Sequence, residues 1–188
     1  MAENLKGKKV AILAADGFEQ AELEKPRQAL NDAGAETVLV SPAKDKVKGW
    51  DMKDWGREVK VDLLLDEADP AEFDALQLPG GVMNPDHLRM NPKAVQFVKH
   101  FFESGKPVAA ICHAPWTLVE ADVVKDRTVT SWPSLKTDLS NAGANWVDKE
   151  VVRDKNLVTS RKPDDIPAFN REMIALFAEG NAGAKKAA

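Results

Sequence analysis

The one cysteine of this chain, Cys112, ends an apolar run at 108–111 and is followed directly by His113, where a helix is expected to begin. A strand that turns sharply into a helix pushes the side chain at the turn out of the sheet, and the free N–H groups of the helix favour negative charge there. Such surroundings lower a thiol pKa from about 8.5 to between about 3.5 and 7.5. The segment therefore predicts a thiolate that attacks carbonyls or peroxides. The competing interpretation is a buried cysteine that packs as a small apolar residue.

Two glycines, Gly80 and Gly81, close another apolar strand. Glycine lets backbone N–H groups approach a reacting carbonyl closely, which an oxyanion site requires. A plain β-turn is the alternative interpretation of Pro-Gly-Gly taken alone. In an open parallel sheet, however, this turn and the Cys112 turn both lie at the carboxyl ends of their strands, where ligands bind.

The histidines are His87, His100 and His113, so none follows position 113. This order excludes the papain type and the amidotransferase triad, whose histidines come well after the cysteine. One cysteine and three histidines at this spacing match no zinc pattern, so we expect neither a metal nor a cofactor. His113 is the candidate base, and the alternative is a histidine that packs beside the site without catalysing.

Two acids are further candidates. Glu19 follows the first expected strand, at the end of the sheet where Cys112 also emerges. A partly buried carboxyl near a thiolate has a raised pKa and can donate a proton, although an acid here also suits a helix N-terminus. Asp86 follows Asn84-Pro85 and is by default a turn or cap residue.

Length and composition set broad limits. The 188 residues suit one α/β domain, expected over 1–180, with a flexible tail at 181–188. A net charge of -4 and a pI of about 5.5 argue against specific binding of nucleic acid or of an anionic membrane. No apolar run predicts a membrane span or a signal peptide. A single cysteine forms no internal disulfide, which favours the cytoplasm.

Hydrophobic periodicity predicts alternating strands and helices. Strands are expected at 9–15, 36–42, 73–81, 108–112, 128–130, 151–153 and 157–160, with a small hairpin or edge excursion in 43–65. Helices are expected at 19–33, with an interruption at Pro26, and at 92–104, 114–121, 134–142 and 166–178.

Four motifs together resemble the PfpI endopeptidase family, a branch of the class I glutamine amidotransferase-like superfamily that also holds the parkinsonism-associated protein deglycase. The resemblance runs from Lys9 to Phe177. It implies a flavodoxin-like fold, a three-layer α/β/α sandwich with a mostly parallel central sheet and a nucleophile elbow. The motifs are Asp16-Gly17-Phe18-Glu19, Phe73-Asp74-Ala75-Leu76 with Leu78-Pro79-Gly80-Gly81, Ala110-Ile111-Cys112-His113-Ala114-Pro115 and Ser160-Arg161-Lys162-Pro163-Asp164-Asp165.

The resemblance also implies roles for site residues. Cys112 matches the family nucleophile, His113 its neighbouring base, and Glu19 the acid that hydrogen bonds the cysteine. Gly81 and the backbone of His113 match the oxyanion donors, with Gly80 beside them.

In PfpI-type members the third acid of the triad comes from the next subunit, from a Pro-acid pair shortly after Pro-Gly-Gly. Pro85-Asp86 fits this place, with one more residue after the glycines and Asp instead of Glu. The resemblance therefore implies a homo-oligomer, a dimer or higher, in which Asp86 completes the neighbour's site.

The implied activity is that of a cysteine-dependent hydrolase in stress protection. The Cys112 thiolate would attack a carbonyl or hemithioacetal-type carbon in a glyoxal or methylglyoxal adduct of an amino acid or protein, or it would cleave peptides. A second class of function is a redox-responsive stress protein without substantial turnover, whose Cys112 is oxidised to a sulfenic or sulfinic acid stabilised by protonated Glu19. A glutaminase subunit is disfavoured because no histidine follows position 113.

Overall fold

The computed structural model describes residues 4–180, and the tail expected at 181–188 lies outside the described residues. A seven-stranded sheet runs through the molecule in the order β11-β12-β8-β7-β1-β3-β6. Each neighbouring pair is parallel except β11 with β12, which form an antiparallel hairpin. The strands are β1 (Lys9–Leu13), β3 (Glu36–Ser41), β6 (Leu63–Leu64), β7 (Ala75–Leu78), β8 (Val108–Ile111), β11 (Val151–Asp154) and β12 (Leu157–Ser160).

Two smaller sheets flank this one. The expected hairpin in 43–65 is present as an antiparallel pair, to which a two-residue strand adds in parallel. This sheet contains β2 (Phe18–Glu19), β4 (Lys46–Asp51) and β5 (Asp54–Lys60), and the other contains β9 (Thr128–Val129) and β10 (Asn145–Trp146).

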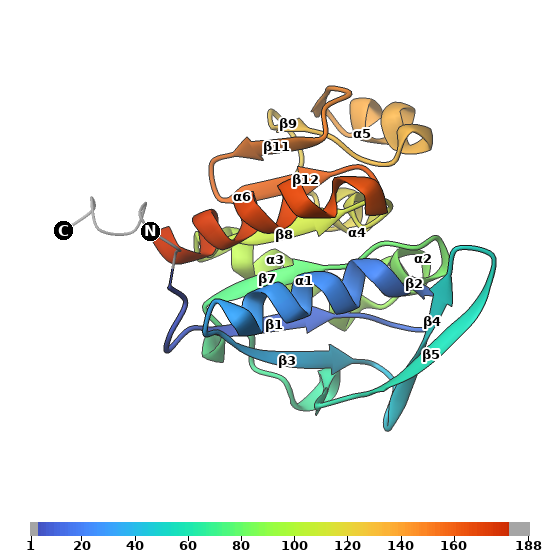
Figure 1. The fold of residues 1–188 in the computed structure, drawn as a ribbon. Coiled ribbons are helices and arrows are strands. Elements are labelled where there is room, and N and C mark those ends of the chain that lie inside the picture. Colours follow the sequence, from blue (N-terminus) through green and yellow to red (C-terminus); the bar gives the residue numbers. More distant parts are fainter. Residues whose placement is uncertain (1–3, 181–188) are drawn as a thin grey trace.

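The helices cover both faces of the central sheet (Figure 1). They are α1 (Gln20–Asp32), α2 (Met83–Arg89), α3 (Pro92–Glu103), α4 (Pro115–Glu120), α5 (Lys136–Asn141) and α6 (Ile166–Glu179). Short 3-10 helices are η1 (Leu65–Glu67), η2 (Pro70–Glu72), η3 (Pro133–Leu135) and η4 (Pro163–Asp165).

Alternate residues of the buried strands supply two cores. Side chains such as Val10 and Ala109 pack with α1 and α6 on one face, whereas Ala11 and Ala110 pack with α2, α3, α4 and α5 on the other. This arrangement is the three-layer α/β/α sandwich with a mostly parallel sheet that the resemblance implied. Between residues 4 and 180, none of the helices combines the length and apolar character that crossing a membrane requires.

Strand register determines where the site forms. Leu78 of β7 lies beside Ala110 of β8, and Ile12 of β1 lies beside Gln77 of β7. Because these neighbours are parallel, the loops that follow them leave the same edge of the sheet. The glycines after β7, the Cys112 turn after β8 and the segment after β1 therefore meet there.

The expected interruption at Pro26 is wrong, because α1 continues through this residue. A proline inside a helix leaves the carbonyl four residues earlier without its N–H donor. Here that carbonyl belongs to Glu22, and the buried side chain of Gln77 donates to it over 3.2 Å. The strand thus replaces the missing helical hydrogen bond and ties α1 to β7. The sequence patterns also missed α2, which follows the two glycines directly.

Candidate active site

Cys112 stands on a strained turn between β8 and α4. Its φ of 63° lies in the left-handed region, which a residue with a Cβ adopts only at a cost of roughly 1–2 kcal/mol. Two hydrogen bonds hold the turn, because the Cys112 N–H donates to Ser160 O over 3.0 Å and the Cys112 carbonyl accepts from Trp132 N–H over 2.9 Å. The turn has the form of a nucleophile elbow, with a side chain that is 6% exposed.

Three groups of the adjoining turns surround the sulfur. Nδ1 of His113 lies 3.1 Å from Sγ of Cys112. The backbone N–H groups of Gly81 and His113 also hydrogen bond to the thiol, and both lower its pKa. These two N–H donors lie beside the sulfur, to which the carbon that bears an oxyanion would be bonded.

Glu22, rather than Glu19, supplies the carboxyl that interacts with the Cys112 thiol. The assignment from the sequence is corrected by one helical turn, because Glu19 still belongs to β2, while Glu22 lies in the first turn of α1. Oε2 of Glu22 accepts from the Gly80 N–H over 2.9 Å, and Oε1 is buried. The signal available in the sequence was a second acid, Glu22, three positions after Glu19 and inside the expected helix.

Burial makes the Glu22 carboxyl a weak acid. The side chain is fully buried, and burial raises its pKa to about 8, with a further contribution from the charge of Glu19. Glu22 is therefore mostly neutral at pH 7. Since Oε2 accepts the Gly80 N–H, Oε1 is the oxygen left to carry the proton.

The backbone N–H of Gly80 binds the Glu22 carboxyl and is not available to an oxyanion. Its N–H is used by the carboxylate oxygen, so the donors left at the sulfur are those of Gly81 and His113. A Cβ at Gly80 would lie 2.6 Å from Oε2 of Glu22 and 2.7 Å from Cβ of Cys112. Only glycine fits this close approach of two loops, which is more than a plain β-turn requires.

The expectation of a lowered thiol pKa is wrong in this structure. Burial raises the pKa of Cys112 well above its ordinary value, the charge on Glu22 raises it further, and the N–H groups of Gly81 and His113 oppose this only in part. The short helix α4 starts three residues after the cysteine, and burial outweighs its N-terminal field. The resting group is a thiol that needs a base.

His113 is suited to be that base. It is 7% exposed, and burial lowers its pKa to about 4, so the imidazole is neutral at pH 7. A neutral ring that accepts at Nδ1 carries its proton on Nε2. Its ring also stacks on Trp132, a contact that no pattern in the sequence indicated.

The thiol opens into a pocket of about 470 Å³. Trp50 and Met52 of the β4–β5 hairpin line one part of it, and Lys162 and Asp164 of the loop after β12 line another. Glu19 lines it as well, 8% exposed, with its pKa raised by burial and by the charge of Asp51, against a hydrogen bond from the Met52 N–H. The pocket thus offers both apolar and charged groups to a substrate.

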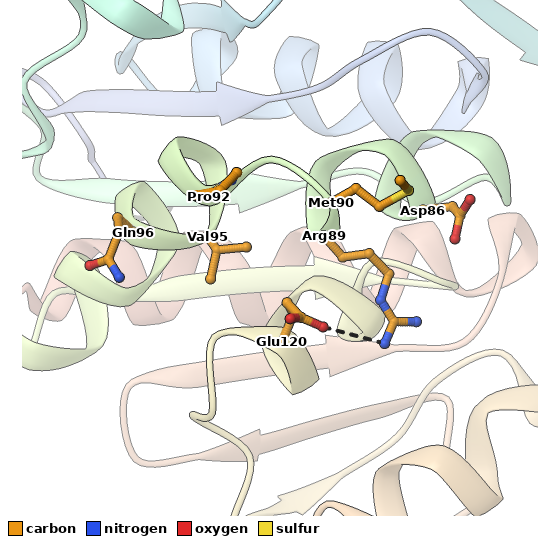
Figure 2. Close-up of a pocket in the computed structure, with 7 residues that line it drawn as sticks. All are labelled: Asp86, Arg89, Met90, Pro92, Val95, Gln96 and Glu120. Atoms are coloured by element: carbon orange, nitrogen blue, oxygen red, sulfur yellow. Dashed lines mark ion pairs between the residues drawn. The ribbon is translucent and has the colours of Figure 1, made fainter.

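Asp86 lies elsewhere on the chain. It is exposed in the first turn of α2 and lines a separate surface pocket with Arg89 and Glu120, which form an ion pair at 3.7 Å (Figure 2). Within one chain it does not line the Cys112 pocket. A role for Asp86 in a neighbouring subunit's site remains a prediction.

Across residues 4–180 there is no group of three His, Cys, Asp or Glu side chains arranged to hold a metal ion. The geometry is that of a buried cysteine with a histidine base, a neutral carboxylic acid and two backbone donors. A family model described as DJ-1/PfpI matches residues 8–176. The chain belongs to the DJ-1/PfpI family.

The chain aligns with named relatives over nearly their whole length. A deglycase of Thermococcus kodakarensis is 48% identical over 169 residues, which are 90% of this chain and 99% of the relative. Protein/nucleic acid deglycase 2 of Escherichia coli is 47% identical over 172 residues, 90% of this chain and 98% of the relative. Among solved structures, DJ-1beta of Drosophila melanogaster superposes with a TM-score of 0.83 at 28% identity, covering 91% of this chain and 90% of that one. The flavodoxin-like fold of the DJ-1/PfpI family is therefore the fold of this chain.

Proposed function

We propose that this DJ-1/PfpI protein is a cysteine-dependent deglycase that removes glyoxal-type or methylglyoxal-type carbonyl adducts from amines. The observation that carries the proposal is the 3.1 Å contact between Sγ of Cys112 and Nδ1 of His113, beside two backbone donors. The deglycase names of two relatives give the substrate class. A third relative, 46% identical over 173 residues, is named general stress protein 18 in Bacillus subtilis, which supports a role in stress protection.

The first step is addition of the thiol to the adduct carbonyl. The Cys112 proton moves to Nδ1 of His113 as the sulfur forms a bond to carbon, and the electron pair of the C=O bond moves to oxygen. The N–H groups of Gly81 and His113 hold that oxyanion. In an aminocarbinol adduct the amine is bonded to the carbon next to that carbonyl. The hydroxyl proton of this carbon passes to the oxyanion, its C–N bond breaks as a C=O bond forms, and the amine leaves with the His113 proton. The hemithioacetal-type carbon then releases the Cys112 sulfur as a thiol, and water hydrates the freed dicarbonyl.

Glu22 keeps this pocket free of a competing charge. As a neutral acid at pH 7 it places no negative charge beside the sulfur during attack. An ionised carboxylate at the same place would repel both the sulfur and the oxyanion. The raised thiol pKa gives less support to the redox alternative, because oxidation depends on thiolate character.

The proposal extends to assembly and location. Nε2 of His113 would donate to Asp86 of a second copy, which requires a homo-oligomer in which α2 of one chain approaches the site of the next. A lone free thiol suits the reducing cytoplasm.

An activity panel tests the proposal. Methylglyoxal adducts of arginine and lysine, together with unmodified peptides, are supplied to wild type and to Cys112→Ala. We expect wild type to release the free amino acids and Cys112→Ala to lose at least about 10³-fold in rate, because no other nucleophile lines up with the two donors.

The control is His100→Gln, a change at a histidine of α3 that does not line the Cys112 pocket, which should keep the wild-type rate. Turnover of peptides but not of adducts would replace the deglycase proposal by a peptidase. Equal rates in wild type and Cys112→Ala would refute both.

A further inference from the structure

Two tryptophans contact the imidazole of His113. The ring of Trp132 stacks on it with centroids 5.6 Å apart and planes 22° apart. Trp116 meets it edge to face, with centroids 5.3 Å apart and planes 62° apart. Contacts of these two kinds restrict both the tilt and the rotation of a ring.

The backbone fixes the first tryptophan relative to the nucleophile. The Trp132 N–H donates to the Cys112 carbonyl, so the residue that carries the stacking ring is bonded to the elbow itself. Its side chain is 38% exposed and lines the pocket, which places one part of the indole against His113 and leaves another part open. The ring thus covers a face of the imidazole that solvent would otherwise reach.

Polar partners hold the second tryptophan. Nε1 of Trp116 donates to Asp138 over 2.8 Å, and the guanidinium of Arg89 lies 5.7 Å from the centre of the indole ring. Arg89 is paired in turn with Glu120, as Figure 2 shows. Trp116 is therefore held from the side away from the pocket.

We propose that Trp132, supported by Trp116, is a positioning residue that fixes the plane of the His113 imidazole toward Cys112 and keeps water from its face. This inference rests on the proposed role of His113 as the base. The stacked indole keeps the ring neutral in the resting site, with Nδ1 directed at the thiol proton. Without the indole the ring hydrates, gains a proton more easily and loses its alignment.

The charged groups around His113 do not account for its neutrality. Cys112 and Glu22, both neutral at pH 7, lie on the sulfur side, and Lys162, Asp164 and Glu19 line the open pocket. Beyond Trp116 stand Arg89 and Asp138, one of each sign. Burial is the cause that lowers the His113 pKa to about 4. Among the residues that line the pocket, Trp132 is the one whose ring stacks on His113.

The experiment measures the His113 imidazole directly by NMR titration. A His87→Gln, His100→Gln background leaves His113 as the only histidine signal. Trp132→Ala and Trp132→Phe are compared in this background. Trp50→Ala is the matched control, since Trp50 lines the same pocket and its ring packs on Trp55. The pH dependence of kcat/KM for the best adduct is recorded alongside.

We expect Trp132→Ala to raise the His113 pKa by more than about one pH unit toward its ordinary 6.5 and to move the acid limb of kcat/KM upward with it. Trp132→Phe should restore most of both values, and Trp50→Ala should shift neither. The inference is overturned if the His113 pKa is the same in wild type and Trp132→Ala, or if Trp50→Ala shifts it as far. The titration needs no turnover, so it decides this point even if no adduct is cleaved.

Discussion

At Cys112 the state of the sulfur depends on burial and on its two neutral neighbours, Glu22 and His113, more than on its place at the start of a helix. Burial raises the pKa of the thiol and of Glu22, and it lowers the pKa of His113. The result is a site that carries little charge at rest and separates charge only as the sulfur attacks. Such a site matches the burial of Cys112, because an isolated buried thiolate would be costly.

The rate should depend on pH through two residues. kcat/KM is expected to rise as His113 loses its proton near pH 4 and to fall as Glu22 loses its proton near pH 8. Glu22→Gln stays neutral and still accepts the Gly80 N–H, so its alkaline limb should move upward by at least about one pH unit. A pH series of initial rates measures this.

Glu24→Gln is the matched control, an acid on the same helix that pairs with Arg57 at the surface. It should keep the wild-type profile. An alkaline limb that stays near pH 8 in Glu22→Gln would show that another group causes it.

The free energy of unfolding should also depend on pH through the Glu22 carboxyl, in a direction that its raised pKa determines. The folded-state pKa of Glu22 lies above its unfolded value, so its contribution is present in acid and is lost as pH rises through about 8. Glu22→Gln should therefore gain stability relative to wild type at pH 9 but not at pH 5, as urea unfolding at the two pH values measures.

At the scale of elements, the position of Glu22 depends on how α1 is attached to β7. Pro26 cannot donate to the Glu22 carbonyl, and Gln77 does so from the neighbouring strand. Helix and strand are thus joined at the residue that touches the thiol. A buried carbonyl left without a donor costs about 1–3 kcal/mol.

A double-mutant cycle tests this attachment. Gln77→Met removes the donor at similar volume and should destabilise the protein by about 1–3 kcal/mol in urea unfolding. In a Pro26→Ala background the new N–H at position 26 can bond to the carbonyl, so the same change should cost less. Equal costs in the two backgrounds would contradict the proposed exchange of donors.

Local patterns in the sequence predicted most elements and failed where long-range contacts decide. The buried strands and α3, α4 and α6 follow from periodicity, and the hairpin in 43–65 follows from its alternating pattern. Continuity through Pro26 needed Gln77, which is 55 positions further along. The identity of the acid at the thiol depended on which residue near the start of α1 faces Cys112, and that residue is Glu22, one helical turn after Glu19.

The protonation states of Cys112 and His113 could not be predicted from the sequence for a related reason. The motif around Cys112 indicated an elbow, and the elbow is present, with φ of 63°. The depth of burial at Cys112 and His113 depends on the pocket walls, which include Trp132, 20 positions away, and the loop 160–165. Burial reversed the expected direction of the thiol pKa.

For the whole molecule, the proposed assembly predicts sites shared between subunits. Asp86→Ala and Cys112→Ala should each be inactive, and a refolded equal mixture should recover about a quarter of wild-type activity, because mixed pairs contain one site with both groups intact. Activity is measured against the mixing ratio. Glu67→Ala, a change at an exposed acid in η1, serves as the control and should be active alone. A mixture as inactive as its components would place Asp86 outside the site.

The most direct measurement is mass spectrometry of the enzyme quenched during turnover of a methylglyoxal adduct. Since Cys112 is the only cysteine, a covalent intermediate has one predicted location. We expect the peptide that contains Cys112 to carry the mass of the carbonyl fragment early in the reaction and to lose it as the adduct is consumed. Turnover with that fragment bound at another residue, or with Cys112 unmodified at every time point, would contradict nucleophilic attack by this sulfur.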